Sequence, residues 1–169
     1  GTWSRQWSEI KRAATEDGKV LSVYLFEPQP RFVSRLSAMA RQHNFTFVHA
    51  AAARADGEQS FTLEGAKDSK SASLAGSTVS AAGMRTSVRT IDLAAFLRVR
   101  LVSPARASPS LMKLDTEGFE YQLLPWLIAQ GALCHLTHLH IEWHLNMLPP
   151  EQRLSALGLR LNFGTLLEH

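Results

Sequence analysis

The spacing of apolar residues along the chain alternates between two periods. Residues 4–16 and 30–44 place apolar side chains three or four positions apart, which predicts two amphipathic helices. The nearly continuous apolar runs at 20–26 and 111–114 predict strands buried on both faces of a parallel sheet. The same patterns predict strands at 45–49, 59–63, 84–90 and 136–143, and helices at 91–100, after 115–120 as far as Gly131, and at 149–167.

Turn and capping residues mark the ends of several of these elements. Pro30 suits the first turn of the second helix, and Thr90 is expected to cap the helix that starts at Ile91. Residues 65–83 are rich in Ser, Ala, Gly and Lys, which predicts a mobile surface loop. Strands that alternate with helices indicate an α/β fold with an open, mostly parallel sheet, and we expect residues 1–169 to form a single domain.

Length, composition and charge exclude several classes of protein. The chain has 169 residues, of which 45% are hydrophobic and 20% charged, the balance of an ordinary globular domain. The net charge is +3, and Lys and Arg are spread along the chain with no continuous block. The apolar runs are far shorter than the roughly 20 residues that span a bilayer. We therefore expect neither a nucleic-acid nor a membrane partner. The single cysteine, Cys134, is expected to be a buried apolar residue, and it favours a cytoplasmic location.

Acidic residues stand at the carboxyl ends of three expected strands, at Glu27, Asp115 and Glu142. In open α/β sheets, ligands bind outside these strand ends. An acid that ends a strand about 20 residues after a glycine turn is the arrangement that holds a ribose, and Gly1 and Glu27 stand in that order. The alternative for Glu27 is an acid at the start of the following helix, where the helix dipole favours negative charge.

Two stretches of the chain resemble the hallmark stretches of one enzyme family. Phe-Glu-Pro-Gln-Pro at 26–30 and Lys-Leu-Asp-Thr-Glu-Gly-Phe-Glu at 113–120 closely resemble segments of the FkbM-type methyltransferases. Residues 50–57, 88–92 and 141–144 are similar to further segments of that family. The segments run in the family's order from residue 1 to about 150, so the ordered set carries more weight than any single stretch.

The resemblance implies a Rossmann-like fold that binds S-adenosylmethionine and passes its methyl group to an acceptor, usually to an oxygen. Gly1 would be the last glycine of the cofactor loop, and Glu27 would hold the ribose hydroxyls. Ala51 would lie near the adenine, and Asp115 beside the methionine moiety or the acceptor. Against the family pattern, the sequence lacks the first strand, most of the glycine loop and the final strands, so we expect a truncated methyltransferase domain.

Methyl transfer to a hydroxyl benefits from a base within hydrogen-bond reach of the acceptor. The candidates are Asp115, Glu142 and His144, which stand at the ends of neighbouring expected strands. We predict that His144 is the base and that Asp115 is the orienting residue. The alternative for His144 is a capping or surface histidine. The expected acceptor is a small molecule or a glycan, and the sequence indicates neither which one nor the oligomeric state.

Alternating histidines suggest a metal site as a further hypothesis. His138, His140, Glu142 and His144 share one face of the expected strand. Some O-methyltransferases hold a divalent ion between carboxylates at these strand ends, and Asp115 with Glu142 could do so. However, side chains two positions apart on a strand are about 7 Å from each other, so only neighbours could share an ion. We therefore favour a structural role for His138 and His140.

Alternatives remain for two acidic residues and for the function of the chain. Glu117 and Glu120 open an expected helix, where we predict N-terminal capping and not catalysis. The first functional alternative is a catalytically inactive methyltransferase-like fragment that serves as an interaction domain. The second is a nicotinamide-dependent oxidoreductase, for which the sequence offers no complete glycine fingerprint.

Overall fold

The computed structural model describes residues 21–63, 72–73, 84–101 and 109–166, together with the helical residues Glu9, Arg12 and Glu16. The chain divides into two compact units, residues 1–50 and 51–169, and each is described by itself. Gly1, most of the helix expected at 4–16 and most of the loop expected at 65–83 lie outside the described residues.

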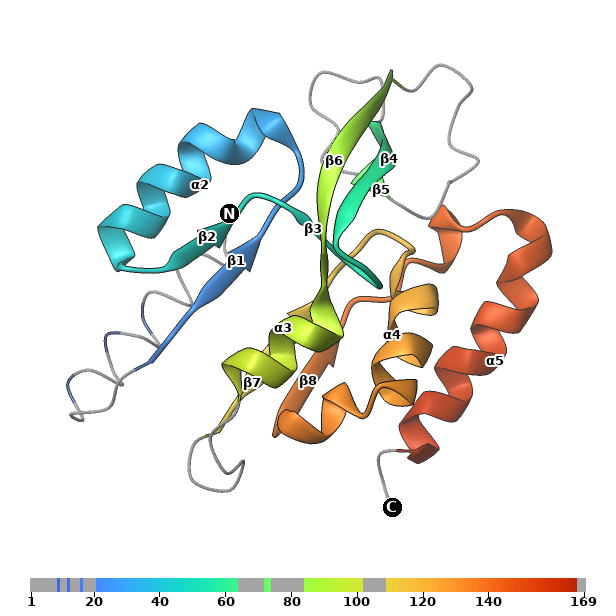
Figure 1. The fold of residues 1–169 in the computed structure, drawn as a ribbon. Helices are drawn as coiled ribbons and strands as arrows, with labels where there is room; N and C mark the ends of the chain where they lie inside the picture. Colours follow the sequence, from blue (N-terminus) through green and yellow to red (C-terminus); the bar gives the residue numbers. More distant parts are fainter. Residues whose placement is uncertain are drawn as a thin grey trace. The chain divides into compact units, whose positions relative to one another are not determined.

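The first unit contains a parallel strand pair connected by a helix. Strand β1 (Tyr24–Phe26) pairs with β2 (Thr46–Val48), and α2 (Pro30–His43) connects them (Figure 1). Pro30 opens α2, as its restricted φ angle favours, and Asn44 ends the helix in a left-handed conformation with φ 53°. The expected helix and the expected strand at 45–49 are confirmed. Residues 21–23 lie outside the shorter β1, because β2 offers only three residues for pairing.

The second unit begins with a four-stranded mixed sheet. Strands β3 (Ala51–Ala53) and β4 (Gly57–Leu63) lie on opposite sides of β6 (Met84–Asp92), and β5 (Ala72–Ser73) follows β4. The chain reverses between β3 and β4, so β3 runs parallel to β6 whereas β4 is antiparallel to both β6 and β5. An open, mostly parallel sheet was expected, and this part of the prediction is not confirmed. The described strands form three small sheets, and one of them is mixed.

The helix after β6, α3 (Leu93–Arg100), begins two residues later than expected and has a different cap. The Asp92 carboxylate accepts a hydrogen bond from the Ala95 backbone N–H at 3.1 Å, which satisfies one of the open donors of the first turn. Thr90 was the expected cap, but it lies within β6, and its hydroxyl donates to the Ala55 carbonyl at 2.9 Å. The extra strand residues move the N-cap to Asp92 and the first helical residue to Leu93.

A second parallel pair consists of β7 (Leu111–Leu114) and β8 (His138–Ile141). The connection contains α4 (Glu120–Ala129) and the 3-10 helix η1 (Ala132–His135). Where the two strands begin, Ser110 and Thr137 are joined by several hydrogen bonds. The Ser110 N–H donates to Thr137 Oγ1 at 2.8 Å, the Thr137 N–H to Ser110 Oγ at 3.1 Å, and the Thr137 hydroxyl to the Ser110 carbonyl at 2.6 Å. This Ser110–Thr137 pair fixes the point from which both strands run.

The chain continues through the 3-10 helix η2 (Leu145–Met147) into α5 (Pro150–Leu166), which packs beside α4 (Figure 1). One hydrophobic cluster joins these helices. It contains Tyr121, Leu148 and Ala156, with Trp143, Leu145 and Leu159 packed against it. The most deeply buried apolar side chains of α4 are Leu123, Leu124 and Leu127.

Two further observations concern Cys134 and the length of the described helices. Cys134 lies in η1 and is exposed, so the prediction that it is buried is wrong. Among the described helices, none combines the length and the apolar character needed to cross a membrane.

Candidate functional site

The candidate site lies at the carboxyl ends of β7 and β8. Because these two strands are parallel, both end at the same edge, and the polar residues that follow them converge there. Lys113, near the end of β7, bridges the two strand ends. Its Nζ contacts Asp115 Oδ2 and donates to Glu142 Oε2 at 2.8 Å.

The His144 imidazole lies among four carboxylates. Its Nε2 atom is 3.7 Å from Asp115 Oδ1, 3.6 Å from Glu117 Oε2 and 3.8 Å from Glu142 Oε1. Its Nδ1 atom is 3.4 Å from Glu120 Oε1. The structure thus brings together the three residues expected to take part in catalysis, Asp115, Glu142 and His144. We call His144, the four acidic residues around it and Lys113 the His144 cluster.

An unusual turn brings Glu117 into the cluster. Glu117 has φ 53° and the following Gly118 has φ 99°, both in the left-handed region. A residue other than glycine pays a steric penalty there, so surrounding contacts must hold the turn. The turn leaves the Glu117 carboxylate 3.6 Å from His144 Nε2. Burial raises the pKa of Glu117, and the charges of Asp115, Glu120 and Glu142 raise it further, although His144 opposes this shift.

The completely buried Glu120 differs most from its expected role. Its Oε2 atom accepts hydrogen bonds from the Thr116 hydroxyl at 3.0 Å and the Gly118 N–H at 2.9 Å. Its Oε1 atom accepts the His144 backbone N–H at 2.6 Å. Glu120 is the first residue of α4, but none of these donors belongs to that helix. The prediction of simple N-terminal capping is therefore corrected, because the carboxylate ties the turn to the segment after β8.

Lys113 holds the exposed side of the cluster in its charged form. Hydrogen bonding from Lys113 holds the pKa of Glu142 below its usual range, although partial burial opposes this shift. Burial by itself lowers the pKa of Lys113, but hydrogen bonds and charge interactions with Asp115 and Glu142 outweigh it, so the net pKa is raised. Both shifts favour the ionised pair near neutral pH.

A lysine lies against the two carboxylates that were considered as ligands of a divalent ion. Asp115 and Glu142 each turn an oxygen toward the Lys113 ammonium, which already supplies the positive charge between them. Asp115, Glu117 and His144 offer three donor atoms within 4.8 Å of one another, and among the described residues this is the group with ligand-like spacing. Acidic groups are often this close without an ion, and we assign no metal here.

The two histidines of β8 lie outside the cluster. His138 and His140 are on the exposed face of the strand, and the His138 Nδ1 atom is 3.0 Å from Thr137 Oγ1. Neither histidine belongs to the group of converging donor atoms found in the described part of the chain. Their structural role stays a prediction.

Of the residues predicted to bind the cofactor, Asp115 belongs to the His144 cluster, whereas Glu27 and Ala51 belong to other elements. Glu27 follows β1 directly, and its Oε1 atom accepts the Gln29 backbone N–H at 2.8 Å, immediately before α2. This bond agrees with the alternative of an acid at a helix start, and it leaves the predicted ribose contact untested. Ala51 is the buried first residue of β3, and Gly1 lies outside the described residues.

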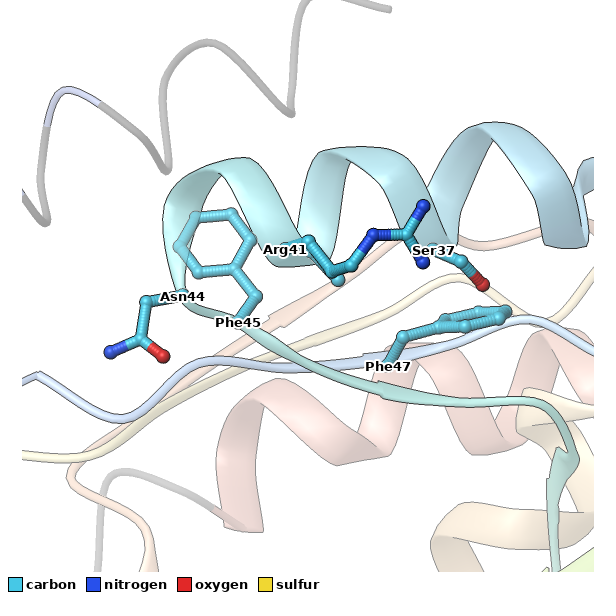
Figure 2. Close-up of a pocket in the computed structure, with 6 residues that line it drawn as sticks. Ser37, Arg41, Asn44, Phe45 and Phe47 are labelled. Atoms are coloured by element: carbon cyan, nitrogen blue, oxygen red, sulfur yellow. The ribbon is translucent and has the colours of Figure 1, made fainter.

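The first unit also has an open pocket of about 500 Å³ beside α2 (Figure 2). None of the predicted site residues lines it, and its one charged side chain is that of Arg41. The lining residues are Ser37, Ala40, Arg41, Asn44, Phe45 and Phe47. The pocket therefore adds nothing to the candidate site.

Comparison with known proteins identifies the family. The model of the methyltransferase FkbM domain matches residues 3–162. The chain belongs to the FkbM methyltransferase family. This match confirms the resemblance expected from the sequence, and it includes Glu27, Ala51 and the whole His144 cluster. No curated protein and no solved structure matches the chain.

Proposed function

We propose that this FkbM-family chain is an S-adenosylmethionine-dependent methyltransferase that methylates an oxygen of a small molecule or a glycan. The supporting observation is the family match over residues 3–162, which contains an ordered cluster of acids and a histidine at two strand ends. A Rossmann-like methyltransferase fold is part of the proposal, and the parallel pairs β1–β2, β3–β6 and β7–β8 are compatible with it.

The chemistry of the described residues suits this cofactor. When bound, S-adenosylmethionine supplies a methyl group on a positively charged sulfur. The Glu27 carboxylate follows a parallel strand and can accept hydrogen bonds from the two ribose hydroxyls. Ala51 has a small apolar side chain suited to contact with an adenine ring. Asp115 provides a carboxylate for the methionine moiety or the acceptor, and Gly1 is the glycine expected near the cofactor.

Within the His144 cluster, the residues have different proposed roles. His144 Nε2 accepts the proton of the acceptor hydroxyl as that oxygen is methylated. Asp115 orients the acceptor or the imidazole, since its Oδ1 atom lies 3.7 Å from Nε2. Glu142 contributes negative charge that stabilises the imidazolium formed by proton transfer, and Lys113 fixes the positions of both carboxylates. Positioning of this kind supplies much of the rate acceleration in a displacement reaction.

The proposal is tested by calorimetric titration of the folded chain with S-adenosylmethionine and S-adenosylhomocysteine. We expect saturable binding of both ligands. Glu27→Gln retains an acceptor for the Gln29 N–H but removes the charge, so binding should weaken by about ten- to a hundredfold, the worth of a charge-assisted hydrogen bond. The matched control is Glu151→Gln, an exposed acid in the first turn of α5, which should bind like the wild type.

Two results would contradict the proposal. A folded chain that binds neither ligand would favour the alternative of an inactive interaction domain. Equal weakening by Glu27→Gln and Glu151→Gln would remove Glu27 from the cofactor site. Circular dichroism of each variant separates these results from unfolding.

A further inference from the structure

Glu120 is a completely buried carboxylate to which the proposed function gives no task. Burial of a charge is expensive unless donors surround it, and here the donors are well defined. The Thr116 hydroxyl and the Gly118 N–H satisfy Oε2, while the backbone N–H of His144 donates to Oε1 at 2.6 Å. The carboxylate therefore has a fixed place, with Oε1 directed to His144.

The two ring nitrogens of His144 have different surroundings. Nδ1 is buried and has no hydrogen-bond partner among the described residues, and the Glu120 Oε1 atom lies 3.4 Å from it. This distance lies within ion-pair range, but the contact lacks hydrogen-bond geometry. Nε2 instead faces Asp115, Glu117 and Glu142, at 3.6 to 3.8 Å. Among the four carboxylates around the ring, Glu120 is the one paired with Nδ1.

We propose that Glu120 is the positioning residue of His144, holding the proton on Nδ1 and thereby leaving the Nε2 lone pair toward Asp115 and Glu117. The bond made by one ring nitrogen of a histidine determines which tautomer the other nitrogen presents. Formation of this hydrogen bond requires the ring to reorient and the 3.4 Å contact to shorten toward the usual range of about 2.7–3.2 Å, while the carboxylate is already fixed. Because Glu120 is completely buried, it acts through His144 and does not touch the acceptor.

This inference rests on the proposed function in one respect, namely that His144 Nε2 accepts the proton of the methyl acceptor. The tautomer itself is a property of the protein alone. It can be measured without cofactor or acceptor, so its failure is distinguishable from a failure of S-adenosylmethionine binding in the calorimetric titration.

The test is nuclear magnetic resonance of the full chain with ¹⁵N-labelled histidine, at pH ~8.5, well above the ordinary histidine pKa of about 6.5. His144→Gln identifies the His144 signals by their disappearance. In the wild type we expect the proton on Nδ1. Glu120→Met removes the acceptor and should abolish this preference, whereas Thr116→Val removes only a donor to the opposite carboxylate oxygen and should preserve it.

Two results would overturn the inference. One is a wild-type ring with its proton on Nε2 and none on Nδ1. The other is an unchanged His144 spectrum in a folded Glu120→Met variant. If Glu120→Met does not fold, the wild-type spectrum still tests the inference, because a proton on Nε2 and none on Nδ1 would overturn it.

Discussion

Replacement of Lys113 by methionine is a sharp test of the electrostatics of the His144 cluster. Methionine keeps most of the aliphatic length of lysine but removes the ammonium that bridges Asp115 and Glu142. The substitution would leave the carboxylates around His144 without their bridging cation. We therefore expect the folded state to lose stability through charge and not through packing.

The expected loss follows from exposure. A hydrogen bond to a charged group contributes about 1.5–3 kcal/mol when well shielded from water, and an exposed ion pair about 0.2–1 kcal/mol. The Lys113 side chain is 15% exposed, but its partners Asp115 and Glu142 are 34% and 50% exposed. Each contact thus belongs between the two limits, at about 1 kcal/mol, and Lys113→Met should reduce the free energy of unfolding by about 2 kcal/mol.

The loss should depend on pH in a defined way. The pKa of Glu142 is lowered from its ordinary value of 4.5, so its contribution is present above that value and disappears as the pH falls through the lowered pKa. The pKa of Lys113 is raised from its ordinary value of 10.5, so its contribution is present below that value and disappears as the pH rises through the raised pKa. The difference between variant and wild type should therefore be largest between these two values.

Urea unfolding followed by circular dichroism, at pH ~7 and pH ~3.5, measures this difference. Arg35→Met, which removes an exposed cation from α2, serves as the control and should change stability by less than about 0.5 kcal/mol. An equal loss at both pH values for Lys113→Met would refute the reasoning, because it would show that the loss does not depend on the ionisation of the carboxylates that Lys113 contacts.

Substitutions at three further positions test separate parts of the second unit. Glu117→Gln should raise the free energy of unfolding near neutral pH, because the raised pKa of Glu117 means that its charged form is disfavoured in the folded state; a gain that persists below pH ~4 would contradict this cause. Asp92→Ala should lose about 0.5–2 kcal/mol in urea unfolding, since it removes the cap bond from Ala95, whereas Asp92→Asn should lose much less. Leu123→Ala should lose about 2–5 kcal/mol by the same assay, as expected for a completely buried side chain, and a loss below ~1 kcal/mol would mean that the core around α4 is poorly packed.

The sequence predicted most helices and strands because the spacing of apolar residues and the positions of turn and capping residues reflect local structure. Pro30, for example, marked the start of α2 correctly. The pairing of strands was not predictable in the same way, since an alternating or apolar pattern specifies neither partner nor direction. The reversal between β3 and β4 makes β4 antiparallel to β6, and three-residue β2 limits the length of β1. Strand partner, direction and length therefore depend on tertiary contacts, which the local sequence pattern does not specify.

The candidate site was predictable only where chain direction determines proximity. Asp115, Glu142 and His144 were expected together because parallel strands end at one edge, and the structure brings them together. Lys113 was overlooked, although it lies in β7 two positions before Asp115, and side chains two positions apart along an extended backbone point the same way. Glu120 was assigned to helix capping, since burial of an acid depends on a turn whose left-handed residues cannot be read from the sequence.

The Ser110–Thr137 pair has a consequence for residues that it never touches. It sets the alignment of β7 and β8 at their starts, and the ladder then places Leu114 opposite Ile141 at their ends. A slip of one position would shift one strand by about 3.3 Å and turn its side chains to the opposite face. The effect would reach the carboxyl ends of the strands, about 16 Å from the two hydroxyls. The geometry around His144 therefore depends on two small side chains at the opposite end of the strand pair. Substitutions of Ser110 or Thr137 would alter the site without changing any residue in it.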